Sequence, residues 1–188
     1  MKVRPWQVEV ARTEFDHPLL QLEAQELRAG ADRRQAVVLR SADWVNVIPL
    51  IEAEPGADGK GATVVFIRQW RFGRAAESLE IPGGIVEPGE DGGVAAAREL
   101  HEETGYRAGT IERLGEVEPN PAILDNVCSL WLARDLVHTG DPIGDGSEEI
   151  EVVHVPLREV PERIASGEIS HSLVVTAFYF FARRYGFS

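Results

Sequence analysis

The 188-residue sequence has little cysteine, little positive charge and no long apolar run. Its one cysteine, Cys128, excludes an intrachain disulfide framework and is typical of proteins from reducing compartments. Lys and Arg number 19 against 31 Asp and Glu, a net charge of −12. Nucleic-acid backbones and anionic membranes require basic surfaces, so this excess of acid argues against both as partners. The longest apolar run, residues 173–182, is about half of a membrane span.

The rest of the composition is that of an ordinary globular chain, with 44% hydrophobic and 27% charged residues. A chain of this length can bury one substantial core. The first residues lack the apolar segment of a signal peptide, and we expect a cytoplasmic protein.

Strand patterns dominate the first part of the chain. Residues 6–10 alternate with period two, and 35–40 and 44–50 also predict strands, while 19–27 suits either a strand pair or a short helix. We therefore divide the chain into N-terminal strands at 1–50, a candidate dimerisation element, and a second domain at 51–188. In that domain, residues 62–70 form an almost continuous apolar run, which is typical of a strand buried on both faces.

Residues 84–106, G-I-V-E-P-G-E-D-G-G-V-A-A-A-R-E-L-H-E-E-T-G-Y, predict a Gly/Pro-rich turn followed by a helix. Asp91 is an acceptable N-cap and Gly105 a typical glycine after a helix end. Val94, Ala97 and Leu100 recur at helical spacing and are expected to dock the helix on a sheet. Further strands are expected at 111–117, 127–136 and 150–155, then a short helix at 156–167 and a last helix capped by Ser170.

The predicted helix concentrates carboxylates on one face. Glu99 and Glu103 are four residues apart, and Glu102 extends the same edge. Like charges at this spacing repel one another, so a helix that needed only solubility would more often interleave lysines. Clustered carboxylate oxygens suit a hard divalent cation, Mg²⁺ or Mn²⁺, that retains waters for a phosphate substrate. A plain acidic surface helix is the competing interpretation.

The spacing of Gly84, Glu90, Arg98-Glu99, Glu102-Glu103 and Gly105 resembles the Nudix box. Tyr106 departs from it, since a small aliphatic residue usually stands at that position. The resemblance implies the α/β/α sandwich of the Nudix fold, an α/β protein with a mixed sheet and the box helix packed on it. The N-terminal antiparallel strands would be an addition to this fold.

The resemblance also implies roles for the box residues. The metal ligands would be Glu99 and Glu103, with Glu102 as a further ligand and the backbone carbonyl of Gly83 reaching the metal. Arg98 would hold Glu102 or Glu90 and belongs with Glu102 to the catalytic set. Three residues would be structural in the motif: Gly84, Glu90 and Gly105.

Segments outside the box resemble the Nudix pyrophosphatases that act on ADP-ribose and nucleotide sugars. The R-Q-W-R segment assigns Arg71, and less surely Arg68, to the substrate diphosphate, although a strand end paired with surface acids explains Arg68 equally well. Pro121 stands where that group carries a pocket proline, with Asn120 and Asp125 as hydrogen-bonding candidates, although a rigid connector is nearly as good an interpretation. Either Trp44 or Trp6 could stack on a base, or pack in the core.

The acidic loop before residues 150–155 resembles the segment that, in those enzymes, supplies a glutamate to activate the attacking water. Glu148 is the first choice for that base and Glu149 the second, against the alternative of a solvated acidic loop. We expect a Mg²⁺- or Mn²⁺-dependent pyrophosphohydrolase that cleaves ADP-ribose or a related nucleoside diphosphate sugar to a nucleoside monophosphate and a sugar phosphate. Such enzymes are commonly homodimers.

Two alternatives remain open. The chain could be a nucleoside-triphosphate or RNA 5′-end pyrophosphohydrolase, although its acidic charge weighs against RNA. It could also be a non-catalytic nucleotide-binding module on the same fold, although a module freed from catalysis has no need of clustered carboxylates.

Overall fold

The computed structural model describes residues 2–52, 61–142 and 149–187. Contacts divide the chain into two compact units, one of residues 1–43 with 118–127 and one of residues 44–117 with 128–188. Our sequence-based boundary at residue 50 lies six residues beyond the start of the second unit, because the strand that begins at Trp44 pairs with strands of that unit.

The first unit contains an antiparallel sheet of three strands: β1 (Gln7–His17), β2 (Leu20–Ala29) and β3 (Asp32–Arg40). The ambiguous stretch 19–27 is therefore a strand. Residues 118–127 join this unit through the bond from the Leu39 amide to the Ile123 carbonyl, 2.7 Å, and through Arg40, whose Nη1 donates to the Asp125 carboxylate at 2.8 Å. Every residue of β1 is exposed.

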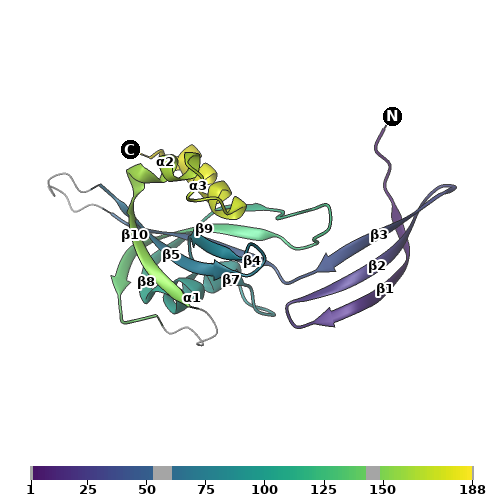
Figure 1. Cartoon of the computed structure of the whole chain (residues 1–188), viewed down its shortest axis with the longest axis horizontal. Helices are drawn as coiled ribbons and strands as arrows, with labels where there is room; N and C mark the ends of the chain where they lie inside the picture. The colour runs from purple at the N-terminus through teal and green to yellow at the C-terminus, as the bar shows by residue number, and fades with distance from the viewer. Residues whose placement is uncertain (1, 53–60, 143–148, 188) are drawn as a thin grey trace. The chain divides into compact units, whose positions relative to one another are not determined.

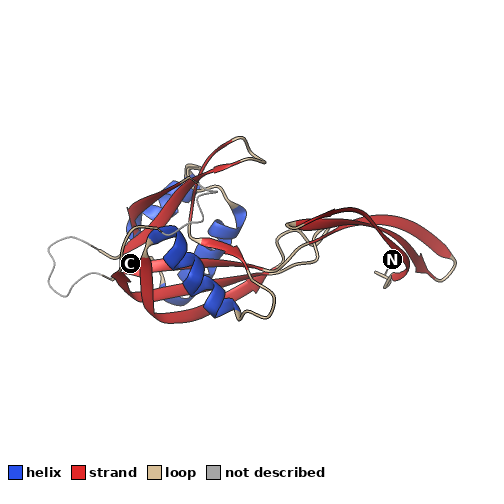
Figure 2. Cartoon of the chain, turned by 90° about the horizontal axis from the view of Figure 1, so that it is seen from below, coloured by secondary structure: helices blue, strands red, loops and turns tan. Residues whose placement is uncertain are grey.

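The second unit is built on a mixed sheet, in which β4 (Trp44–Ile51) and β9 (Cys128–His138) are parallel and the other pairs antiparallel. The order is β10-β5-β4-β9-β8, with β5 at Thr63–Arg71, β8 at Tyr106–Val117 and β10 at Ile150–Pro156. Helices cover both faces of this sheet (Figures 1 and 2). The predicted α/β/α sandwich is confirmed.

One face of the sheet holds the box helix, α1 (Gly92–Thr104). Asp91 caps it by accepting the Gly93 amide at 2.9 Å, and Gly105 ends it in the left-handed conformation with φ of 73°. Its docking residues are Ala95, Ala96 and Leu100, which pack on a cluster with Val45, Val47 and Ala133. Our expectation for Val94 was wrong, because that side chain points to solvent and is 59% exposed.

The other face packs against α3 (Ser172–Tyr185), whose Phe178 and Phe181 meet Phe66 and Ile48 of the sheet. A short turn η1 (Leu157–Glu159) and α2 (Val160–Ala165) precede it. The predicted cap was wrong by one residue: His171 holds the N-cap position of α3 without a side-chain bond. The Ser170 hydroxyl instead accepts a bond from Arg74 at 2.6 Å, which removes it from the helix start.

The sheet splits between its two central strands. β4 and β5 pair only at Leu50–Val64 and Ile51–Thr63. Beyond that point β6 (Ala76–Glu80) pairs with β5, and β7 (Gly83–Ile85) pairs with β4. The short connection at Ile81 and Pro82 carries the chain across the split, directly before the box.

Cys128 lies fully buried in β9. Burial raises the pKa of its thiol to about 12. The thiol is thus inert at neutral pH, as expected for a buried cysteine in an apolar strand.

Candidate active site

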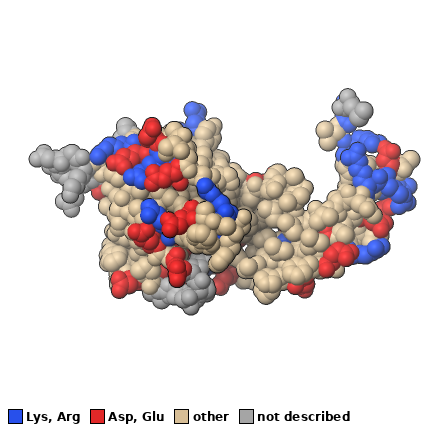
Figure 3. Space-filling view, viewed as in Figure 1, with Lys and Arg blue, Asp and Glu red and all other residues tan. Residues whose placement is uncertain are grey.

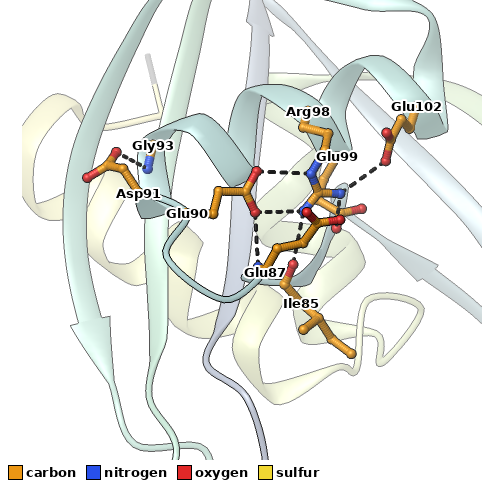
Figure 4. Close-up of polar contacts among 8 residues, drawn as sticks. All are labelled: Ile85, Glu87, Glu90, Asp91, Gly93, Arg98, Glu99 and Glu102. Atoms are coloured by element: carbon orange, nitrogen blue, oxygen red, sulfur yellow. Dashed lines mark hydrogen bonds and ion pairs between the residues drawn. The ribbon is translucent and has the colours of Figure 1, made fainter. Parts of the chain in front are cut away.

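Arg98 lies at the centre of the carboxylate cluster on α1 (Figure 4). It holds Glu90 through two bonds of 3.0 Å, from Nε and Nη2. Its Nη1 donates to Glu99 at 2.8 Å and to Glu102 at 3.1 Å, and Nη2 also reaches the Ile85 carbonyl at 3.0 Å. Arg98 thus holds both partners that the sequence offered as alternatives, and Glu99 as well. One guanidinium bonds all three carboxylates and offsets part of their charge, which reduces the repulsion among them.

The same contacts shift the ionisation of the cluster. The bonds to Glu90, and then those to Glu99, raise the pKa of Arg98. In return, the Arg98 hydrogen bonds hold the pKa of Glu90 below its usual value, despite opposition from burial. Both groups are therefore charged at neutral pH.

The turn at Gly83 and Gly84 brings the two predicted principal ligands together. The Gly83 amide donates to the Glu103 carboxylate at 2.9 Å, and Glu103 is 6% exposed. A Cβ added to Gly84 would lie 2.3 Å from Glu99 Oε1, so only glycine leaves room for that carboxylate. The carboxylates of Glu99 and Glu103, one turn apart on α1, therefore both converge on this glycine turn.

The donor chemistry of this face fits a divalent cation, since Glu99, Glu102 and Glu103 offer only carboxylate oxygens. Across the described ranges, however, no group of three His, Cys, Asp or Glu side chains is arranged to hold a metal ion. Arg98 bonds Glu99 and Glu102, and the Gly83 amide bonds Glu103, so these three carboxylates already have hydrogen-bond partners. The three glutamates thus fit a cation by their oxygen donors, and Glu99 and Glu103 also converge on the glycine turn. To bind the cation, they would have to exchange or share their bonds with Arg98 and with the Gly83 amide.

A pocket of about 380 Å³ opens next to the glycine turn, where β4 and β5 separate. It is lined by residues of both strands, of the turn and of the start of α3, among them Trp44, Asn46, Arg71, Gly84, Glu103 and His171. Of the residues predicted for the site, Trp44, Arg71, Gly83 and Glu103 line this pocket, whereas Glu99 and Glu102 are not part of its lining.

Arg71 is anchored in this pocket by a buried carboxylate. Its Nε and Nη2 donate to the two oxygens of Glu80 at 2.9 and 2.7 Å, and Glu80 is 1% exposed. Burial alone would raise the pKa of Glu80, but the hydrogen bonds and charge of Arg71 outweigh it, and the net pKa is lowered. Glu80 is therefore ionised at neutral pH, and Arg71 is fixed by a bidentate pair.

Arg68 and Glu149 line a neighbouring pocket of about 390 Å³, which includes Trp70 and shares Gln69 with the first. Arg68 also approaches the Glu151 carboxylate at 3.4 Å. The first-choice base, Glu148, lies outside the described residues. Pro121, Asn120 and Asp125 belong to the other compact unit, so their contact with substrate stays a prediction.

Sequence reasoning missed two residues of the site, Glu80 and His171. A signal for Glu80 was present, because a carboxylate inside an apolar strand segment, L-E-I-P, is buried only when paired. His171 gave no local signal, since it follows the box helix by more than sixty residues and reaches the pocket only through the packing of α3.

Comparison with known proteins identifies the family of the domain that carries this site. Residues 45–174 match the model of the NUDIX domain. The chain is 30% identical over 107 residues to the ADP-ribose pyrophosphatase of Bacillus subtilis, covering 56% of this chain and 58% of that protein. It is 30% identical over 149 residues to the ADP-sugar pyrophosphatase of Mus musculus, covering 74% and 65%.

A third relative, the methanol dehydrogenase activator of Bacillus methanolicus, is 33% identical over 115 residues, covering 61% of this chain and 62% of that protein. The matched segments thus span less than two thirds of the length of these relatives. A crystal structure of an ADP compounds hydrolase superposes over 100% of both chains with a TM-score of 0.81 and 21% identity. At that identity the likeness establishes the fold. No helix in the described part of the chain is long and apolar enough to cross a membrane.

Proposed function

This chain belongs to the Nudix family, whose hydrolases act on phosphoanhydride bonds, and from that membership we propose that it is a divalent-metal-dependent pyrophosphohydrolase of ADP-ribose or a related nucleoside diphosphate sugar. The products are a nucleoside monophosphate and a sugar phosphate. The observation that carries the proposal is the convergence of Glu99 and Glu103 on the Gly83–Gly84 turn, beside a pocket that also presents Arg71.

The residues of the chain divide the work of phosphoanhydride cleavage. Glu99, Glu103 and Glu102 would hold the cation, with the Gly83 carbonyl, and Mg²⁺ or Mn²⁺ suits their oxygens. When bound, such a cation neutralises charge on the diphosphate and lowers the pKa of a coordinated water. Arg98 keeps the carboxylates oriented. Its two hydrogen bonds to Glu90 fix the segment that leads into α1.

The substrate side of the reaction falls to residues outside the box. Arg71, fixed by Glu80, binds a diphosphate oxygen by a charge-assisted bond, and Arg68 in the neighbouring pocket is the second candidate. Glu148 or Glu149 accepts the proton of the attacking water. Trp44 is a wall of the pocket on which a base can stack.

Two other functions are weaker on the same observations. A triphosphate or RNA 5′-end hydrolase would use the same box, but the net charge of −12 disfavours RNA. A non-catalytic nucleotide-binding module does not account for glutamates packed this tightly around one arginine.

The test is a substrate panel with Mg²⁺ or Mn²⁺, in which ADP-ribose, GDP-mannose, UDP-glucose, NADH, diadenosine polyphosphates and ATP are followed by chromatography. We expect cleavage of a nucleoside diphosphate sugar that is abolished by EDTA and reduced by orders of magnitude in Glu102→Gln. The matched control is Glu116→Gln, an exposed glutamate on β8 outside the box that pairs with Arg113. Activity confined to triphosphates, or none at all, would contradict the proposal.

We further propose that the functional unit is a homodimer formed through the first compact unit. Its three strands expose Val8, Val10, Phe15 and Val37, each at least 37% accessible. A three-stranded sheet needs a packed hydrophobic face for stability, and no helix of the described chain belongs to this unit. A second copy would supply that packing, and its charge is compatible, because residues 1–43 carry seven basic and seven acidic side chains.

A further inference from the structure

One wall of the pocket includes two ionisable side chains that the box does not contain, Arg71 and His171. Glu80 of β6 is buried between Arg71 and His171. Arg71 bonds both oxygens of Glu80, and His171 Nδ1 lies 3.9 Å from Glu80 Oε2, too far for a hydrogen bond. These three residues join β5, β6 and the start of α3 at the edge of the split in the sheet.

Among the described residues, no hydrogen bond gives the His171 side chain a structural role. It occupies the N-cap position of α3 but caps no amide. Its Nδ1 is buried and has no hydrogen-bond partner within the described part of the chain, which is uncommon in folded proteins. The side chain is 33% exposed and is one of the residues that line the pocket.

The surroundings of the imidazole determine which nitrogen carries the proton. Burial, and to a smaller degree Arg71, lowers the pKa of His171 against the opposing effect of Glu80, so the ring is neutral at pH 7. A neutral imidazole has one N–H and one lone pair. The ionised Glu80 attracts an N–H and repels a lone pair, so its position near Nδ1 favours the tautomer that is protonated on Nδ1. This leaves Nε2, on the other edge of the ring, as a hydrogen-bond acceptor.

A hydrogen-bond acceptor at this position can bind only a ligand group that donates a proton. Ionised phosphate oxygens have no proton to donate, whereas sugar hydroxyls do. We propose that His171 determines specificity by accepting a hydrogen bond from a ribose or hexose hydroxyl of the substrate, with Glu80 as the positioning residue for both His171 and Arg71. This assignment rests on the proposed function, because it concerns the sugar of the same nucleoside diphosphate substrate. Arg71 then binds the diphosphate, and His171 recognises the sugar beside it.

The experiment combines a residue change with a substrate change. The kinetics of wild type, His171→Ala and His171→Gln are measured with ADP-ribose and with ADP-ribose analogues that each lack one hydroxyl. Loss of this bond should raise KM for ADP-ribose roughly tenfold in His171→Ala, with a smaller change in kcat. Glutamine, whose amide oxygen accepts a bond, should restore part of the loss. His138→Ala, an exposed histidine outside the pocket lining, is the control and should leave KM unchanged.

Non-additivity between His171→Ala and the removal of a hydroxyl identifies the substrate hydroxyl that bonds to His171. For one deoxy analogue, wild type should show the raised KM and His171→Ala should add nothing further, because the bond is already absent. Equal penalties for His171→Ala on every analogue would overturn the assignment, as would an unchanged KM for ADP-ribose. Circular dichroism and thermal melting verify that each variant is folded.

A binding measurement separates this inference from the proposed function. The imidazole proton resonance of His171, identified by its absence in His171→Ala, is followed by NMR as ADP-ribose is added in EDTA. A shift of this resonance supports the inference even if no nucleoside diphosphate sugar is hydrolysed. Hydrolysis of ADP-ribose without any shift would leave the proposed function standing and refute the role of His171. In Glu80→Gln the resonance should titrate at lower pH, because the charge that raises the pKa of His171 is gone.

Discussion

At the residue scale, the site depends on one cation placed among three anions. Glu90 and Glu99 have side chains only 12% and 13% exposed, so water screens them weakly from each other and from Glu102. Arg98 is the positive charge in contact with all three. Its role in the free protein is therefore to make the carboxylate cluster compatible with a folded helix.

We predict that Arg98→Gln destabilises the protein by about 1–3 kcal/mol at pH 7, in line with the loss of charged hydrogen bonds. The loss should depend on pH. The folded pKa of Glu90 is lowered, so its stabilising contribution is complete above its unfolded pKa and disappears as the pH falls through the folded value. The difference in unfolding free energy between wild type and variant should therefore shrink from pH 7 towards pH 3, as measured by urea denaturation.

The control is Arg113→Gln, which removes an exposed ion pair with Glu116. Exposed pairs of this kind contribute little, about 0–1 kcal/mol. A destabilisation by Arg98→Gln that is the same at pH 7 and pH 3 would show that Arg98 acts through packing and not through the charges of the carboxylates.

At the element scale, the termini of α1 were predictable because they depend on local chemistry. An Asp at the start and a Gly after the end satisfy backbone groups within two or three residues, and both predictions are confirmed. The docking face was predicted less well. Val94 matched the helical period, but the side of α1 that meets the sheet is decided by β4 and β9, which the helix sequence does not encode.

The same distinction separates the parts of the site. The box residues are close in sequence and their cluster follows from helical spacing. The Glu80–His171 contact joins residues 91 positions apart in the chain and exists only because α3 packs beside the split sheet. Ser170 is a similar case. The sequence predicted it as the cap of the last helix, but its hydroxyl accepts a hydrogen bond from Arg74, which is distant in the sequence.

We predict a sharp contrast between two apolar residues of α1. Leu100→Ala should cost about 2–5 kcal/mol, because Leu100 is 0% exposed and its removal leaves a cavity against the sheet. Val94→Ala should change stability by less than about 0.5 kcal/mol, because the side chain is solvated and alanine favours helix. Both values come from denaturant unfolding. A similar cost at the two positions would mean that the helix docks through the face that the sequence period suggested.

At the scale of the whole molecule, charge and exposed apolar surface are distributed unevenly. Residues 1–43 carry equal numbers of acidic and basic side chains, so the net charge of −12 resides after residue 43. On the face shown in Figure 3, basic side chains gather over part of the first unit, whereas acidic and basic side chains alternate over the second. A near-neutral sheet with exposed valines can approach its own copy with little repulsion, which the acidic second unit does not allow as readily.

We therefore predict that the chain is a dimer in sedimentation equilibrium at micromolar concentration. Val10 and Val37 line one hollow of about 330 Å³ on the three-stranded sheet, and the double variant Val10→Glu with Val37→Glu should be monomeric, because it would bury charges without partners. Val137→Glu, on an equally apolar and 61% exposed position of the second unit, is the control and should remain dimeric. A monomeric wild type, or a double variant that stays dimeric while folded, would refute the interface. If dimerisation completes the pocket, the monomer should also lose hydrolytic activity at saturating metal, whereas intact activity would show that one copy forms the whole site.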